Sequence, residues 1–210
     1  YQKVIEEAPA PALADGIREA VRESAERIGR RLEYRGAGTV EFLVAGSEFW
    51  FLELNPRLQV EHPVTELVTG LDLVAEQLQV AAGLPSRWEK PPEQRGHAIE
   101  ARVYAEDPVR FLPSPGKITR WRLPEGEGIR VDTGLSEGDA VTPHYDPLIA
   151  KICTWAPDRP AAIARMARAL EQTEIEGPKT NIPFLRRVLE AKEFTSATHD
   201  TGVVPRLMAD

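Results

Sequence analysis

A strand–turn–strand pattern constrains the fold of this chain more than any other feature. Two runs rich in β-branched and aromatic residues, 39–44 and 49–54, flank the short polar turn Gly46-Ser47-Glu48. Runs of this kind around a tight turn predict a two-stranded β-hairpin. In that hairpin Glu41 and Glu53 are cross-strand neighbours, or nearly so. The fold must therefore accommodate a strand pair that carries two acidic side chains close together.

Helical periodicity flanks the hairpin on both sides. Apolar residues at helical spacing between Leu13 and Leu32 predict one amphipathic helix. A second helical pattern runs from about Thr65 to Ala82, with an interruption at Gly70 and a new start at Asp72.

Residues 84–96, which contain three prolines and end on Gly96, are typical of a linker or long loop. Strand-like runs follow, beginning with an alternating segment from Ala98 to Tyr104. Two more helices are expected, one carrying Met166 and Leu170 and one beginning near Asn181. The pattern predicts an α+β protein with domains at 1–83 and 97–210.

Composition excludes some classes of function. The 210 residues are 42% hydrophobic, which suits a globular protein, and the net charge of −7 argues against a nucleic-acid partner. No apolar run approaches the ~20 residues of a membrane-spanning helix, so no membrane partner is expected. The single cysteine, Cys153, lies in an apolar run and is interpreted as a buried thiol in a reducing compartment.

Polar and apolar residues alternate from Glu53 to Glu61. In an extended chain, alternate residues share a face, so the five polar side chains of this stretch would point the same way: Glu53, Asn55, Arg57, Gln59 and Glu61. A solvated strand face could give the same alternation. Pro56 favours an edge or loop, where functional sites gather, and is the natural corner if the chain bends.

The residue types suggest two kinds of chemistry. Oxygen ligands from Glu41, Glu53 and Asn55 suit a hard cation such as Mg²⁺ or Mn²⁺, although a solvent-exposed glutamate pair is the alternative. Arg57 matches a planar oxyanion such as bicarbonate, and Glu61 could serve as a general base. Gly36-Ala37-Gly38 lacks a third glycine and leads into a strand, so it does not indicate dinucleotide binding.

The stretch 53–66, Glu-Leu-Asn-Pro-Arg-Leu-Gln-Val-Glu-His-Pro-Val-Thr-Glu, closely resembles the signature of biotin-dependent carboxylases in the ATP-grasp superfamily. Further matching segments cover nearly the whole chain: 2–11, 36–42, 96–102, 105–108, 111–116, 145–147 and 179–182. The resemblance implies that residues 1–83 are the C-terminal part of an ATP-grasp domain, an antiparallel sheet with helices. It also implies that 97–210 are the mixed α/β C-terminal domain of a biotin carboxylase.

The resemblance also implies a reaction and its residues. The family uses MgATP to activate bicarbonate as carboxyphosphate and then carboxylates N1′ of biotin. Glu41, Glu53 and Asn55 would hold Mg²⁺ or Mn²⁺ and the ATP phosphates. Arg102 would stabilise the biotin anion. The bicarbonate site would comprise Lys3, Arg57, Gln59, Val60 and Glu61, with Glu61 as the base.

The implied partners are a biotin carboxyl carrier domain, a carboxyltransferase and a second copy of the subunit, in the cytoplasm or the mitochondrial matrix. Relatives often carry His at the position of Tyr1, so no role is assigned there. The lysines and glycine-rich lid that hold ATP in relatives lie upstream of the matching segments, so we interpret the sequence as a fragment without turnover of its own. The alternatives are another ATP-grasp ligase, such as a carbamoyl-phosphate synthetase, and a non-catalytic dimerisation or scaffold module.

Overall fold

The computed structural model describes residues 3–86, 88 and 90–209, so Tyr1 and Gln2 lie outside the described residues. The chain divides into two compact units. We call Ala10–Gln94 the hairpin unit; the sheet unit comprises Arg95–Asp210 together with the segment that ends at Pro9. These two units are defined by contacts between residues, and they place the residues before Ala10 with the C-terminal part of the chain. The predicted domain limits, 1–83 and 97–210, place those residues with the hairpin and stay a prediction.

The predicted hairpin is confirmed. Strands β2 (Thr39–Ala45) and β3 (Glu48–Asn55) pair antiparallel around a two-residue turn in which Gly46 has a φ of 61°. Glycine adopts this left-handed conformation without steric cost, so it closes the turn. The register shifts immediately after Glu41, where a β-bulge interrupts the pairing.

Three helices complete the hairpin unit: α1 (Asp15–Arg31), α2 (His62–Thr69) and α3 (Leu73–Ala81). The predicted interruption is confirmed, because Gly70 ends α2 with a φ of 71° and the Asp72 carboxylate accepts a hydrogen bond of 2.8 Å from Ala75 N at the start of α3. Helix α2 begins three residues earlier than predicted. Pro63 lies in its first turn, where a proline needs no hydrogen-bond partner.

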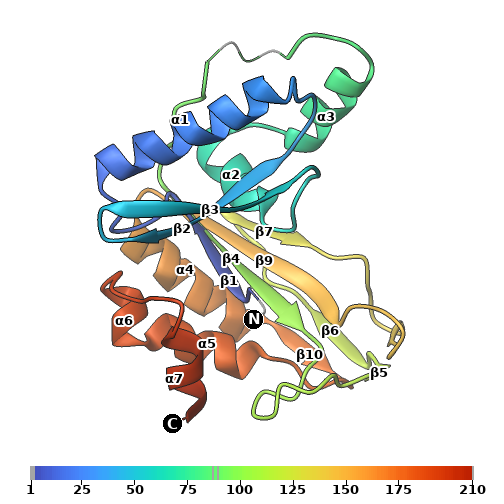
Figure 1. Cartoon of the computed structure of the whole chain (residues 1–210). Helices are drawn as coiled ribbons and strands as arrows, with labels where there is room; N and C mark the ends of the chain where they lie inside the picture. The colour runs from blue at the N-terminus through green and yellow to red at the C-terminus, as the bar shows by residue number, and fades with distance from the viewer. Residues whose placement is uncertain (1–2, 87, 89, 210) are drawn as a thin grey trace. The chain divides into compact units, whose positions relative to one another are not determined.

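The sheet unit is built on one antiparallel sheet with the strand order β1-β4-β9-β7 (Figure 1). Its strands are β1 (Ile5–Ala8), β4 (His97–Tyr104), β9 (Leu148–Ala156) and β7 (Ile129–Asp132). Every residue of β4 is buried. Strand β1 comes from the start of the chain and forms an edge of this sheet, which the sequence pattern did not predict.

Shorter elements surround the sheet. Two small ladders pair β5 (Gly116–Lys117) with β8 (Ala140–Val141) and β6 (Arg120–Arg122) with β10 (Glu174–Glu176). The helices are α4 (Arg159–Gln172), α5 (Ile182–Glu190), α6 (Lys192–Thr195) and α7 (Val203–Ala209).

Helices α4 and α5 form the core of the sheet unit against β4 and β9. The expected apolar residues Met166 and Leu170 of α4 are buried, as are Phe184, Leu185 and Leu189 of α5. Each such side chain contributes roughly 1.5–3 kcal/mol through burial. One face of the sheet packs against this core. Because side chains alternate along a strand, Glu100 and Arg102 point to the opposite face.

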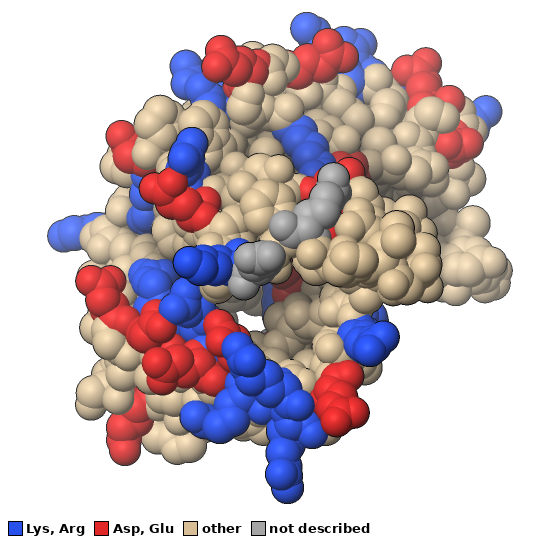
Figure 2. All heavy atoms as spheres, turned by 90° about the horizontal axis from the view of Figure 1, so that it is seen from above, with Lys and Arg blue, Asp and Glu red and all other residues tan. Residues whose placement is uncertain are grey.

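Charged side chains of both signs lie next to one another on the surface shown in Figure 2. Exposed ion pairs such as Arg186 with Glu171, 3.1 Å apart, contribute little to stability. Buried ion pairs therefore matter more for the site. Among the described residues, no helix has both the length and the apolar character that a membrane crossing requires.

Candidate active site

The hairpin places two acidic side chains opposite each other. Glu41 on β2 and Glu53 on β3 are register partners, as predicted. The Asn55 amide Nδ2 donates to both carboxylates, over 3.1 Å to Glu41 Oε1 and 3.2 Å to Glu53 Oε1. Gln59 Nε2 donates to the same Glu41 oxygen over 2.9 Å. We call Glu41, Glu53, Asn55 and Gln59 the hairpin cluster.

The prediction of one extended strip from Glu53 to Glu61 is wrong beyond Asn55, where β3 ends. The backbone N of Arg57 donates to Asn55 O over 2.9 Å, a tight turn centred on Pro56. The bend at Pro56 is therefore confirmed. It brings the buried Gln59 side chain back to Glu41 and leaves Arg57 exposed. Glu61 occupies the N-cap position of α2 and is half-buried.

The donor set of the hairpin cluster fits a hard divalent cation. Two carboxylates and one amide lie within hydrogen-bonding distance, and a half-turn of the Asn55 amide would present its oxygen in place of the NH₂ group. The described residues contain no group of three or more His, Cys, Asp or Glu side chains that could hold a metal. A cation here would therefore need further oxygens from a phosphate or water.

Arg102 lies in the sheet unit, on the central strand β4. Its guanidinium forms an ion pair with Glu6 of β1, and the two side chains are 10% and 11% exposed. Burial lowers the pKa of Arg102, but the carboxylate of Glu6 and the contact with Tyr104 outweigh it and raise the pKa above its ordinary value. Arg102 is therefore a permanently charged group on a largely buried face. Lys3, the other predicted site residue of this unit, is exposed just before β1.

Two residues near Arg102 were not assigned a role from the sequence. Glu100 is fully buried, and burial, reinforced by nearby Glu6, raises the pKa of its carboxyl to about 8. The Asn181 side chain is also buried and bonds the β4 backbone twice, donating 3.0 Å to Arg102 O and accepting 2.9 Å from Tyr104 N. An asparagine before a helix with proline in its first turn predicts a helix cap, but this side chain bonds the strand instead.

The predicted site residues thus form two groups, each within one unit. The hairpin unit holds the hairpin cluster with Arg57, Val60 and Glu61, and the sheet unit holds Lys3 and Arg102.

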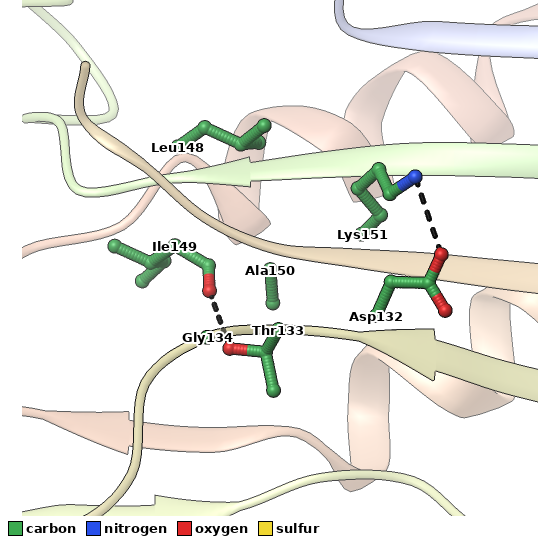
Figure 3. Close-up of a pocket in the computed structure, with 7 residues that line it drawn as sticks. All are labelled: Asp132, Thr133, Gly134, Leu148, Ile149, Ala150 and Lys151. Atoms are coloured by element: carbon green, nitrogen blue, oxygen red, sulfur yellow. Dashed lines mark hydrogen bonds and ion pairs between the residues drawn. The ribbon is translucent and has the colours of Figure 1, made fainter. Parts of the chain in front are cut away.

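A shallow pocket of about 320 Å³ lies in the sheet unit near the end of β7 (Figure 3). None of the predicted site residues lines it. Its lining residues are Asp132, Thr133, Gly134, Leu148, Ile149, Ala150 and Lys151. Lys151 Nζ lies 3.2 Å from Asp132 Oδ2, and the Thr133 hydroxyl donates 2.7 Å to Ile149 O. The polar groups of the pocket are therefore largely paired with one another.

Two family models match the chain. The model for the biotin carboxylase C-terminal domain matches residues 100–206, and the model for the ATP-binding domain of the carbamoyl-phosphate synthase L chain matches residues 1–87. A biotin carboxylase of Halalkalibacterium halodurans is 53% identical over 97% of this chain and 46% of its own length. The chain thus spans about half the length of the curated relatives it matches.

Solved structures give the same result. A biotin carboxylase of Campylobacter jejuni, titled as a beta-gamma-ATP complex, matches with a TM-score of 0.94 and 40% identity over 98% of this chain and 46% of that chain. The biotin carboxylase domain dimer of a 2-oxoglutarate carboxylase from Hydrogenobacter thermophilus also matches with a TM-score of 0.94, at 40% identity over 99% and 47% of the two chains. Its title names MgADP, ADP and bicarbonate.

Fold and sequence together define an ATP-grasp type of ligase scaffold. Within that class, the chain belongs to the biotin carboxylase family. The resemblance drawn from the sequence and the predicted α+β fold are both confirmed.

Proposed function

We propose that this chain forms part of a biotin carboxylase, which uses MgATP and bicarbonate to carboxylate N1′ of biotin through carboxyphosphate. The observation that carries the proposal is the hairpin cluster, where an amide bridges two register-paired carboxylates. Support also comes from the relatives, which are named as biotin carboxylases or biotin carboxylase domains.

Glu41, Glu53 and Asn55 would hold Mg²⁺ or Mn²⁺. When bound, such a cation neutralises and orients phosphate oxygens of ATP. Gln59 donates to Glu41 from the other side, so it fixes the orientation of one ligand carboxylate. The register shifts directly after Glu41 and the pairing resumes at Phe42, so the acidic pair lies beside an irregularity within the ladder.

Bicarbonate would bind to Lys3, Arg57, Gln59, Val60 and Glu61. The exposed Arg57 guanidinium can receive a planar anion with two parallel hydrogen bonds. Glu61 would take the bicarbonate proton as a general base, which makes the anion a better nucleophile toward the ATP γ-phosphorus.

Arg102 would act on biotin. Its charge is permanent and largely buried, so it stabilises negative charge that develops on the ureido oxygen when N1′ loses its proton. The interaction is stronger than it would be in water because the surroundings exclude solvent.

The same proposal implies partners. Biotin would arrive on a carrier domain and leave to a carboxyltransferase, and the subunit would pair with a second copy. The Hydrogenobacter structure is titled as a domain dimer. We place the protein in the cytoplasm or the mitochondrial matrix.

The test is the metal dependence of bicarbonate-dependent ATP cleavage in the complete subunit. Glu41→Gln and Glu53→Gln keep the shape of each side chain and remove one ligand charge, so the Mg²⁺ concentration for half-maximal rate should rise by about tenfold or more. Glu48→Gln, on an exposed residue of the same hairpin, is the matched control and should leave it unchanged. An unaltered metal requirement in both site variants would refute the assignment.

A further inference from the structure

Two cationic side chains face each other at the centre of the sheet. Arg102 on β4 and Lys151 on β9 are direct register partners. Like charges placed directly opposite each other on a sheet destabilise it. Both side chains are largely buried, with Lys151 12% and Arg102 10% exposed, so water screens this repulsion poorly.

Each cation has an acidic partner on its outer side. Glu6 on β1 pairs with Arg102, and Asp132 on β7 pairs with Lys151 over 3.2 Å, the contact drawn in Figure 3. The strand order β1-β4-β9-β7 puts both acids on the outer strands and both cations on the inner strands. The two ion pairs therefore draw the cations apart, and the guanidinium of Arg102 is drawn toward β1.

Glu6 is the carboxylate that can draw the Arg102 guanidinium toward β1. Its register partner is Glu100, and two carboxylates side by side cannot both ionise without repelling each other. Glu100 is fully buried, and burial with the influence of Glu6 raises the pKa of Glu100 to about 8. At neutral pH Glu100 is therefore mostly protonated, so Glu6 is the carboxylate available to Arg102.

Two hydrogen bonds fix the backbone of Arg102. Arg102 N donates to Val4 O over 3.0 Å, which ties it to the chain just before β1. The Asn181 side-chain Nδ2 donates to Arg102 O over 3.0 Å, so the next peptide group is held as well. With the main chain fixed on both sides, the remaining freedom lies in the long arginine side chain, and its charged end is what Glu6 contacts.

We propose that Glu6 is a positioning residue for the biotin step: its carboxylate holds the guanidinium of Arg102 away from Lys151, in the orientation that stabilises the biotin anion. This inference rests on the proposed role of Arg102. Glu6 itself acts through Arg102 and takes no proton from a substrate.

The experiment uses the complete subunit with free biotin as acceptor and measures two rates. Glu6→Gln removes the charge and keeps the shape. It should lower kcat/KM for biotin by about tenfold or more, because the negative charge that attracts the Arg102 guanidinium is lost and only a neutral acceptor remains. Bicarbonate-dependent ATP cleavage without biotin should stay within about twofold. Glu6→Asp retains the charge on a shorter arm and should recover part of the loss.

Glu7→Gln is the matched control. Glu7 is the next residue on the same strand and is equally buried, but it pairs with Arg159 and His97 on the opposite face. This variant should melt at a lower temperature while the ratio of the two rates stays that of the wild type. A general loss of folding would affect both rates in either variant, so the ratio separates positioning from stability.

The result is decided by a double-mutant cycle with Arg102→Ala. If Glu6 acts through Arg102, its substitution adds little to the loss already caused by Arg102→Ala. Fully additive losses, or equal losses in both assays for Glu6→Gln, would overturn the inference and leave the proposed function standing. A normal kcat/KM for biotin in Arg102→Ala would overturn the proposed role of Arg102 as well.

Discussion

Glu7 is the residue whose removal should cost the sheet unit most among its buried charges. Its side chain is 8% exposed and accepts two hydrogen bonds from Arg159, of 2.7 and 3.0 Å, with a third of 2.8 Å to the ring of His97. Arg159 also donates to the backbone of Phe194 and Thr195, so the cluster ties β1 to α4 and α6. Glu7→Gln would leave the largely buried guanidinium of Arg159 without its counter-charge.

The size of the loss follows from this geometry. Removing one partner of a buried ion pair costs about 3–5 kcal/mol. Glutamine keeps one acceptor oxygen, so we expect the lower end, about 3 kcal/mol. For a chain of this size that corresponds to a fall of roughly 6–12 °C in Tm. Glu174→Gln, which breaks a partly exposed pairing with Arg120, is the matched control and should cost less than about 1 kcal/mol.

The stability difference between wild type and Glu7→Gln should also depend on pH. Burial would raise the pKa of Glu7, but the hydrogen bonds from His97 and Arg159 outweigh it and lower the pKa below its usual 4.5. A lowered folded-state pKa means that the carboxylate stabilises the fold fully above about pH 4.5, and that this contribution is lost as the pH falls through the folded-state value.

The assay is unfolding in urea, monitored through the hydrogen exchange of the β4 amides. It is repeated at several pH values. The stability gap between wild type and Glu7→Gln should be constant above about pH 4.5 and should narrow below it. A loss below 1 kcal/mol at pH 7, or a gap that persists unchanged into strong acid, would refute the reasoning.

Three further predictions concern stability and reactivity in the sheet unit. Burial raises the pKa of Glu100 to about 8, so the folded protein holds a proton on this carboxyl that the unfolded chain releases near pH 4.5. The free energy of unfolding should therefore fall as the pH rises between these values, and Glu100→Gln should flatten that fall in urea titrations. Cys153 is fully buried with its pKa raised by burial, so a thiol reagent should react with it no faster than the unit unfolds. Gly177→Ala places a methyl group against the backbone carbonyl of Lys117 and should lower the unfolding free energy by more than about 1 kcal/mol, whereas Gly29→Ala, with open space around it in α1, should be neutral or stabilising.

Local patterns were sufficient to predict the local structure. The hairpin follows from two apolar runs around Gly46, and the break between α2 and α3 follows from Gly70 and Asp72. Each of these depends on residues close in sequence, whose φ preferences and hydrogen bonds act within one turn. The pairing of Glu41 with Glu53 was predictable for the same reason.

Long-range pairing was not predictable from the pattern. Residues 5–8 pair with β4, but their own sequence does not indicate this, because the partner of a strand is set by contacts with residues far away in the sequence. The alternation from Ala98 to Tyr104 predicts a strand with Glu100 and Arg102 on its polar face, yet both side chains are buried. Gln59 reached Glu41 through a bend, whereas periodicity assumes a straight chain. The roles of the site residues remain predictions that enzymology must test.

The position of β1 has a consequence for synthesis of the chain. Glu7 and its partner His97 are separated by 90 residues, and the whole hairpin unit lies between them. At about 5–20 residues per second, a ribosome takes roughly 5–20 s to add that stretch. During this time β1 has no strand to pair with, because β4 has not yet been synthesised. Codon changes that slow translation of Ala10–Gln94 would lengthen the exposure of β1 without altering a single residue of the protein.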